Sequence, residues 1–216
     1  MTDIDARAAN AGLPPFASYP PAPWHARGRC WASIFRADAP AGLPPRLKSL
    51  LDSRLRAVAL IRYEAGSTLC YDELLIGLLA HHGLRCGIYV EHIYVDSVPS
   101  LWGGREIWGL PKRLAAFTWR DGRCRVSDEA GTIATLRVDT RSAKLPIYAP
   151  LAAPAFGLLK ERPAHLVAPV LARLGRCGML LEEWSPRFPY RLGSRPLLRV
   201  AAKPFHARFP VPVMVQ

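Results

Sequence analysis

Lysine is scarce in this chain, although basic residues are abundant. Only five of the 29 basic residues are lysines, so 24 are arginines, and with 17 acidic residues the net charge is +12. The arginines are spread evenly, whereas a nucleic-acid-binding surface gathers its cations on one face or interleaves them with aromatic residues. We therefore expect no nucleic-acid partner, and the excess positive charge favours small anionic ligands instead.

Long apolar runs are also missing. The longest spans residues 74–80, far below the roughly 20 residues that a membrane-spanning helix needs. The chain starts Met1-Thr2-Asp3-Ile4-Asp5, with acidic residues where a secretory signal carries basic ones. These absences predict a cytoplasmic protein with no membrane partner.

Cysteine occurs five times, at widely separated positions, and no two cysteines form a Cys-x-x-Cys pair. An odd number without metal-site spacing is typical of reduced, mostly buried thiols. The adjacent His81 and His82 lack the spacing of a helical metal motif and follow an apolar run, so a turn is the more natural setting for them. We expect no structural metal and no cofactor.

The length and the apolar content fit one domain. The chain has 216 residues, half of them hydrophobic, which is ample for a buried core. Residues 1–28 contain Pro14-Pro15, Pro20-Pro21 and Pro23 and show little periodicity. Because proline cannot donate to a β-ladder, this segment is expected to be an irregular, proline-rich arm. Residues 29–216 then form a single domain.

Most of that domain shows the short apolar or alternating runs that are typical of β-strands. Strands are expected over residues 29–36, 57–63, 69–79, 84–96, 113–120, 123–128, 131–139, 156–161, 179–184 and 197–209. Asp121-Gly122 is a hairpin signal, so the strands after Lys112 form an antiparallel meander with Lys112 at the head of its first member. Residues 164–174 fit a helix or a strand, and prolines 146, 150 and 154 indicate a connector.

Two segments are expected to be helical. Leu43–Leu55 opens with two prolines and places its leucines at helical spacing, with basic residues on the other side. Pro99–Trp108 reads as a glycine-bearing helical turn. The sequence therefore predicts an α+β fold that is mostly antiparallel β, with a few short helices.

Lys112 is the chemical centre of the stretch Gly103–Leu114. Its neighbour Arg113 is permanently charged, and Leu110 and Pro111 would help to exclude water. Both effects predict a lowered pKa for the amine of Lys112. A neutral lysine attacks carbonyl carbons and forms a Schiff base. The alternative is that Pro-Lys-Arg is a solvated turn leading into a strand.

The sequence around Lys112 resembles the lysine-bearing motif of the acetoacetate decarboxylase superfamily. The motif is Gly-Arg-Glu-x-x-Gly-x-Pro-Lys-(Lys/Arg)-Leu. The resemblance implies a closed or cone-like β-barrel or meander. It also implies that Lys112 forms the Schiff base with a β-keto acid and that Arg113 perturbs it. The family carries a glutamate on a Tyr-x-Glu segment upstream, and Tyr71-Asp72-Glu73 stands at a comparable distance, so Glu73 is a catalytic candidate that handles protons.

Further residues are candidates for binding the substrate. The family has an arginine near its N-terminus, and here Arg27 and Arg29 flank that slot while Gly28 occupies it. Arg105 and Glu106 could form a pair that braces the loop before the lysine. The candidate substrate-binding residues are thus Arg27, Arg29, Tyr71, Arg105, Glu106 and Trp108.

The resemblance predicts a Schiff-base lyase that acts on a small β-keto or α-keto acid, by decarboxylation or related enamine chemistry, and that forms a homo-oligomer. Two alternatives stay open. The same iminium serves aldolase and dehydratase reactions, since all of them pass through an enamine or conjugated imine. The second alternative is a non-catalytic ligand-binding or interaction protein with the same fold. In such a protein Lys112 would be only a structural or anion-pairing cation.

Overall fold

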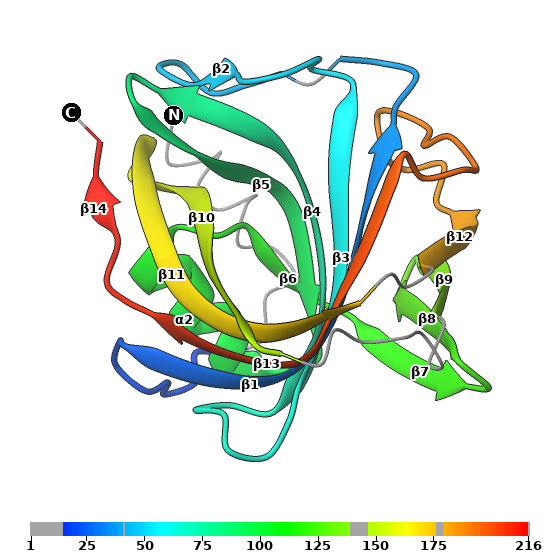
Figure 1. Ribbon diagram of the computed structural model, residues 1–216, viewed down its shortest axis with the longest axis horizontal. Coiled ribbons are helices and arrows are strands. Elements are labelled where there is room, and N and C mark those ends of the chain that lie inside the picture. The colour runs from blue at the N-terminus through cyan, green and yellow to red at the C-terminus, as the bar shows by residue number, and fades with distance from the viewer. Residues whose placement is uncertain (1–14, 41, 139–146, 176–178, 216) are drawn as a thin grey trace.

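Strands are the main elements of the computed structural model, which describes residues 15–40, 42–138, 147–175 and 179–215 (Figure 1). The elements are β1 Trp24–Arg36, β2 Lys48–Ser49, β3 Leu55–Tyr63, β4 Tyr71–His82, β5 Arg85–Val95, α2 Val98–Trp108, β6 Lys112–Leu114, β7 Ala116–Arg120, β8 Arg123–Asp128, β9 Gly131–Val138, β10 Ala149–Leu159, β11 Arg162–Gly175, β12 Met179–Trp184, β13 Leu198–Phe209 and β14 Val213–Met214. The predicted mostly antiparallel β architecture is confirmed.

Seven strands close into a barrel. Their order around the ring is β4-β3-β1-β13-β11-β10-β5, and the pairing of β4 with β5 closes it. All of these pairs are antiparallel except β5 with β10, where Ile88 and Tyr89 lie beside Ala155 and Phe156. The short β6 pairs in parallel with residues 93–95 of β5, beyond the two residues of β5 that pair with β10. A closed sheet leaves few unpaired edges, and its side chains alternate between the interior and the outside.

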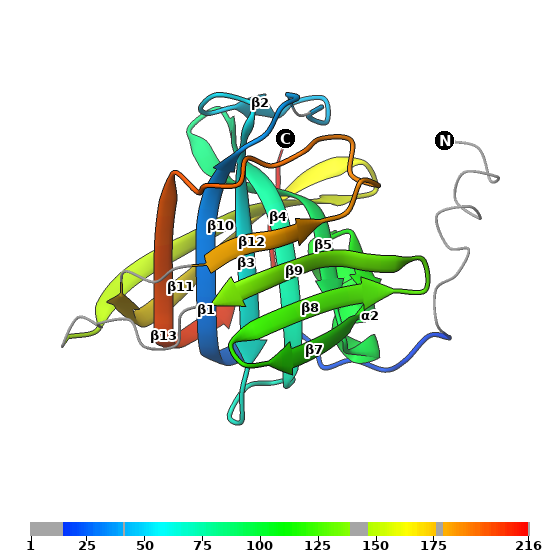
Figure 2. The same ribbon diagram turned by 90° about the vertical axis from the view of Figure 1, so that its right-hand side faces the viewer.

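A second sheet, with the order β12-β9-β8-β7, packs against the outside of the barrel. Figure 2 shows these strands crossing in front of β1, β3 and β4. Leu60, Leu74 and Ile76 from the barrel are fully buried against Val126 and Leu136 from the second sheet. The main hydrophobic core therefore lies between the two sheets, and the barrel interior is free to hold other side chains.

The helix α2 has clear start and stop signals. Ser97 accepts a hydrogen bond from the backbone of Ser100 as N-cap, proline stands in the first turn, and Gly109 ends the helix in the left-handed conformation at φ 65°. A Cβ at Gly109 would meet the carbonyl oxygen of Leu158 at 2.3 Å, so only glycine fits there. The helical turn predicted for residues 99–108 is confirmed, and it delivers the chain to Lys112.

The predicted helix at Leu43–Leu55 is wrong. The segment is turns around the two-residue strand β2, which pairs with His81 and Ala80 of β4. Leu47 alone is buried, in a small cluster with Ala80, whereas Leu50 and Leu51 are 46% and 55% exposed. Only one of these leucines anchors the segment to the core. Backbone hydrogen bonds to β4 stabilise an edge strand here more than the hydrogen bonds of a short helix would.

The boundary of the N-terminal arm also differs. The strand β1 begins at Trp24, so residues 24–28 belong to the barrel. Trp24 and Ala26 are buried while His25 and Arg27 are exposed, and Trp24 pairs with Phe209 of β13. The prolines end just before this strand, which is why the ladder can begin there. Residues 1–14 lie outside the described part of the chain.

Three further expectations change in the second half. The run 113–120 is two strands in different sheets, with β6 on the barrel and β7 in the outer sheet. The expected connector holds β10, whose prolines are tolerated because β10 pairs with β5 over only two residues. Residues 164–174 are strand, within β11.

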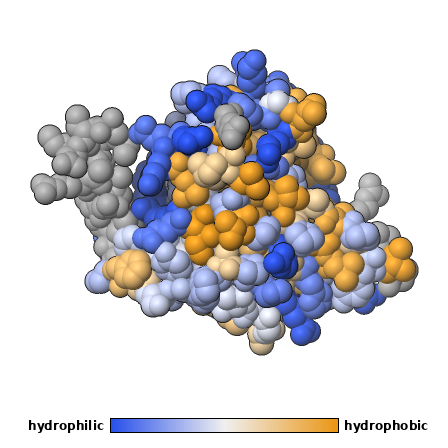
Figure 3. All heavy atoms as spheres, turned by 90° about the vertical axis from the view of Figure 1, so that its left-hand side faces the viewer, coloured by the Kyte–Doolittle hydropathy of each residue, from blue (hydrophilic) through white to orange (hydrophobic). Residues whose placement is uncertain are grey.

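Apolar side chains gather on the face that β10, β11 and β14 present (Figure 3). Exposed members include Leu151, Val167, Leu171, Val213 and Met214. No helix among the described residues is long and apolar enough to cross a bilayer. The homo-oligomer stays a prediction, because the structure contains one chain.

Candidate active site

Lys112 points into the barrel interior and is almost completely buried, with 3% of its surface exposed. Its Nζ donates to Glu73 Oε2 at 2.8 Å, to Ser100 Oγ at 2.8 Å and to the hydroxyl of Tyr71 at 3.3 Å. The solvated-turn alternative is therefore wrong for Lys112. The amine has three polar partners from two elements, β4 and α2, so its position is fixed.

Glu73 is held from the other side by two tyrosines. Tyr63 and Tyr71 donate to its carboxylate oxygens at 3.1 and 3.3 Å, and their rings lie 4.4 Å apart. Asp72, the next residue back, points out of the barrel to Arg62 and Trp119 at 3.0 and 2.7 Å. Because neighbouring strand residues face opposite ways, this outer anchor keeps Glu73 pointing inward.

The structure thus brings together Lys112, Glu73 and Tyr71, as the sequence predicted, and adds Ser100 and Tyr63. Gly104 packs on the aliphatic part of the Lys112 side chain, and Ser100 lies one helical turn before it. The i, i+4 spacing places both residues on one face of the helix, so the sequence could have indicated Ser100 as well. Tyr63 ends an alternating apolar strand and carried no such signal. The cluster closes against Phe205 of β13, across the barrel.

The pKa of Lys112 is raised, so the prediction that it is lowered is wrong. Burial alone would lower this pKa, but the charge of Glu73, together with Tyr71 and the hydrogen bonds of both, outweighs it. Burial, followed by the charge of Glu73, raises the pKa of Tyr71 to about 12, although Lys112 and Ser100 act the other way. The same two causes raise the pKa of Cys30 to about 12. The site is therefore a protonated amine paired with a carboxylate.

Arg113 does not lie beside the amine. Side chains alternate along β6, so Arg113 is exposed on the outer face while Lys112 is buried inside. Arg113 pairs in register with Tyr94, which belongs to the core outside the barrel. The expectation that Arg113 perturbs the amine directly is therefore wrong in its geometry.

Arg27 and Arg29 also lie outside the barrel. Arg29 pairs with Glu64 at 3.0 Å, and its side chain is 56% exposed. Gly28, between them, faces inward, and a Cβ there would meet the carbonyl oxygen of Arg62 at 1.9 Å. No larger side chain fits at that position. Arg27 and Arg29 are exposed on either side of it, and neither is among the hydrogen-bond partners of the Lys112 amine.

The remaining candidates brace the helix and its loop. Arg105 Nε donates to the carbonyl oxygen of Lys112 at 2.8 Å, and Glu106 accepts a hydrogen bond from Tyr19. Trp108 donates to the carbonyl of Pro210 at 2.7 Å and packs edge-on against Trp24. Arg105 and Glu106 therefore form hydrogen bonds to different partners, and the expected ion pair between them is not formed.

Within the described ranges, no group of three histidine, cysteine, aspartate or glutamate side chains could hold a metal ion. The hydrogen-bonded cluster around Lys112 offers one amine, one carboxylate and three hydroxyl groups in a largely buried setting. The carboxylate touches the amine directly, so a proton can pass between them without water.

The family model for acetoacetate decarboxylase matches residues 11–162. An acetoacetate decarboxylase of Ralstonia nicotianae is 35% identical over 124 residues, which is 52% of this chain and 48% of the relative. Acetoacetate decarboxylase 1 of Mesorhizobium japonicum is 31% identical over 112 residues, 48% of this chain and 43% of the relative. The chain spans about half the length of the curated relatives that it matches.

Solved structures share the fold over nearly the whole chain. An acetoacetate decarboxylase from Legionella pneumophila has a TM-score of 0.67 at 17% identity and covers 97% of this chain and 95% of its own. The enduracididine biosynthesis enzyme MppR, complexed with pyruvate, has a TM-score of 0.58 at 18% identity and covers 93% of each chain. Since the family model matches well over half of the residues, the chain belongs to the acetoacetate decarboxylase family.

Proposed function

We propose that this protein forms a Schiff base between Lys112 and a small keto acid, and that it decarboxylates a β-keto acid through that intermediate. The observation that carries the proposal is the buried amine of Lys112, with the carboxylate of Glu73 at 2.8 Å and the hydroxyl of Ser100 at 2.8 Å. Membership of the family supports the same chemistry. The positive net charge favours an anionic substrate.

The first step moves the proton from Lys112 to Glu73. The raised pKa of Lys112 keeps the amine protonated in the empty site, and a protonated amine has no lone pair for attack. The hydrogen bond between Nζ and Oε2 lets the proton cross to the carboxylate. The pair has no net charge before or after the transfer, and burial favours the neutral forms.

The neutral amine then attacks the ketone carbon and gives a carbinolamine. Glu73 returns its proton to the hydroxyl group, which leaves as water, and an iminium forms. The bond to the substrate carboxylate breaks, carbon dioxide leaves, and the electron pair moves into the iminium to give an enamine. The enamine carbon takes up a proton that enters from solvent, and water hydrolyses the new iminium to release a ketone and restore the protonated Lys112 beside the Glu73 carboxylate.

The experiment is reductive trapping. The full chain is incubated with acetoacetate and borohydride, and the adduct is located by mass spectrometry. We expect a stable adduct on Lys112, no adduct in Lys112→Met, and an unchanged adduct in the control Lys48→Met, which alters an exposed lysine. An adduct on other lysines only, or none in the wild type, would overturn the proposal.

A second candidate is condensation or dehydration through the same Schiff base. It is favoured by the interior position of Gly28, which leaves the Arg27 and Arg29 side chains outside and away from a substrate carboxylate. MppR, whose fold this chain shares, has been solved with the condensation product of pyruvate and imidazole 4-carboxaldehyde. Trapping with pyruvate and turnover with an added aldehyde, without release of carbon dioxide, would select this reaction. A non-catalytic binder would give no adduct with either acid.

A further inference from the structure

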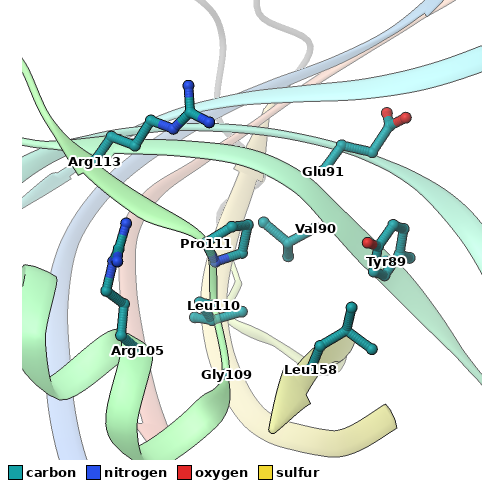
Figure 4. A pocket seen from close by; sticks show the side chains of 9 residues that line it. All are labelled: Tyr89, Val90, Glu91, Arg105, Gly109, Leu110, Pro111, Arg113 and Leu158. Carbon is teal, nitrogen blue, oxygen red and sulfur yellow. The ribbon is translucent and has the colours of Figure 1, made fainter. Parts of the chain in front are cut away.

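A cavity of about 420 Å³ lies on the other side of β6 from the amine. Its lining residues are Tyr89, Val90, Glu91, Arg105, Gly109, Leu110, Pro111, Arg113 and Leu158, and Lys112 is not among them. Figure 4 shows Arg105 and Arg113 together on one side of it, with Tyr89, Glu91 and Leu158 on the other. This volume is in the range of pockets that hold small molecules.

The two arginines are held close together without a carboxylate between them. Within the part of the chain that the structure describes, neither forms an ion pair with an acidic side chain. Arg105 Nε is occupied by the carbonyl oxygen of Lys112, which fixes its guanidinium and leaves the two Nη groups for another acceptor. Burial, followed by the charge of Arg113, lowers the pKa of Arg105, so an added anion would relieve this repulsion.

The acidic residue of the cavity is already paired. Glu91 is the extra residue of a β-bulge, since Ile76 pairs with His92 while Gly77 pairs with Val90. Its Oε2 lies 2.7 Å from Arg56 Nε and also accepts from Tyr190. Glu91 is therefore satisfied by groups outside the cavity and does not neutralise Arg105 or Arg113.

Apart from the hydroxyl group of Tyr89, the rest of the lining is apolar. Val90, Leu110, Pro111 and Leu158 form a surface next to the guanidinium groups. We propose that this cavity binds a small organic anion, with its charged group on Arg105 and Arg113 and its apolar part on these four residues. Arginine pairs favour carboxylate and phosphate oxygens, and the apolar surface selects against a bare inorganic ion.

This site is separate from the proposed catalysis. The amine of Lys112 faces the barrel interior, whereas the cavity is lined by Arg113 and the loop 109–111 and not by Lys112. Binding there needs no covalent step. The two proposals can therefore fail independently.

The test is calorimetric titration of the full-length Lys112→Met variant with hexanoate at low salt, so that no Schiff base contributes. We expect saturable binding, weakened about tenfold by Arg113→Gln through the loss of charge-assisted hydrogen bonds. Arg113→Lys should recover part of the affinity. The control Arg120→Gln removes a charge from a side chain that is 90% exposed and should leave binding unchanged. Thermal unfolding verifies that each variant is folded.

Hexan-1-ol and inorganic phosphate separate the two halves of the proposed ligand. Both should bind to the cavity much more weakly than hexanoate does. Hexan-1-ol lacks the charge, and inorganic phosphate lacks the apolar part. The proposal is overturned if hexanoate does not bind Lys112→Met, or if Arg113→Gln leaves its affinity unchanged. It is also overturned if either partial ligand binds as tightly as hexanoate.

Discussion

Glu73 controls the protonation of Lys112, because it is the charged group that touches the buried amine. The carboxylate raises the pKa of Lys112 against the opposing effect of burial. Removing the charge of Glu73 should therefore let burial lower that pKa. The same carboxylate is the nearest acceptor for the proton that must leave before the amine can react.

We predict that Glu73→Gln shifts the pH dependence of Lys112 and slows turnover. The amine should react with a small aldehyde and borohydride at lower pH than in the wild type, since less of it is protonated at a given pH. If the proposed reaction holds, decarboxylation should fall by about 10²-fold or more, because the variant cannot carry the proton. Trapping rates across pH 6 to about 10.5 and carbon dioxide release measure the two effects.

The matched control is Glu64→Gln, which removes a carboxylate that pairs with Arg29 on the outer face. It should change neither profile. A pH profile for Glu73→Gln that is displaced upward would contradict the assigned role of Glu73.

Some residues of the site could be identified from the sequence, and the role of others could not. Lys112, Glu73 and Tyr71 were identifiable because a motif fixes their spacing. The effect of Arg113 was not, since adjacent residues on a strand point apart and the strand β6 is only three residues long. The sign of the pKa shift of Lys112 depends on a contact between β4 and β6, which local sequence does not contain.

At the scale of elements, α2 positions the amine through its small residues. Ser100 and Gly104 lie on the face that meets Lys112, and a Cβ at Gly104 would meet Cδ and Cε of that lysine at 2.4 and 2.5 Å. A Cβ at the neighbouring Gly103 would meet the ring of Trp24 at 2.5 Å. Two adjacent glycines thus admit two different side chains.

We predict that Gly104→Ala reduces Schiff-base trapping by on the order of 10²-fold while the free energy of unfolding changes by about 1 kcal/mol or less. The flexible lysine stem can move aside, which relieves the clash but misplaces the amine. Gly103→Ala is the control, because it presses on the rigid ring of Trp24 and should destabilise the fold more. Trapping kinetics and urea unfolding measure the pair, and wild-type trapping in Gly104→Ala would contradict this account.

Elements with strong local signals were predictable, and those defined by distant partners were not. The alternating strands and the capped helix α2 follow from periodicity and from Ser97 and Gly109. The segment Leu43–Leu55 has helical leucine spacing, yet its edge pairing with β4 decides its structure. The prolines of β10 are compatible with a strand only because β5 pairs with so little of it, which is a property of the barrel.

At the scale of the whole molecule, a buried ion pair within the barrel also contacts the segment between β12 and β13. Arg56 is fully buried on β3, and its guanidinium carbon lies 4.4 Å from the ring centre of Tyr190. Its partner Glu91 is on β5. Three distant parts of the chain therefore meet at one guanidinium.

We predict that Arg56→Ala destabilises the protein by about 3–5 kcal/mol, because it leaves Glu91 buried without its partner. The control Arg36→Ala breaks a pair with Asp52 whose side chains are 56% and 41% exposed, and should cost about 0–1 kcal/mol. Urea unfolding of both variants provides the comparison. Equal losses would contradict the view that Arg56 joins the layers.

The pairing of β13 between β1 and β11 has a consequence for how this protein is made. Trp24 lies opposite Phe209, so the ring of strands stays open during synthesis until residues 198–209 emerge from the ribosome. Contacts between such distant positions slow folding, because a long loop must be closed first. The nascent chain therefore displays the amine of Lys112 to water until β13 has been made, because the barrel around the amine closes only when that strand pairs with β1 and β11.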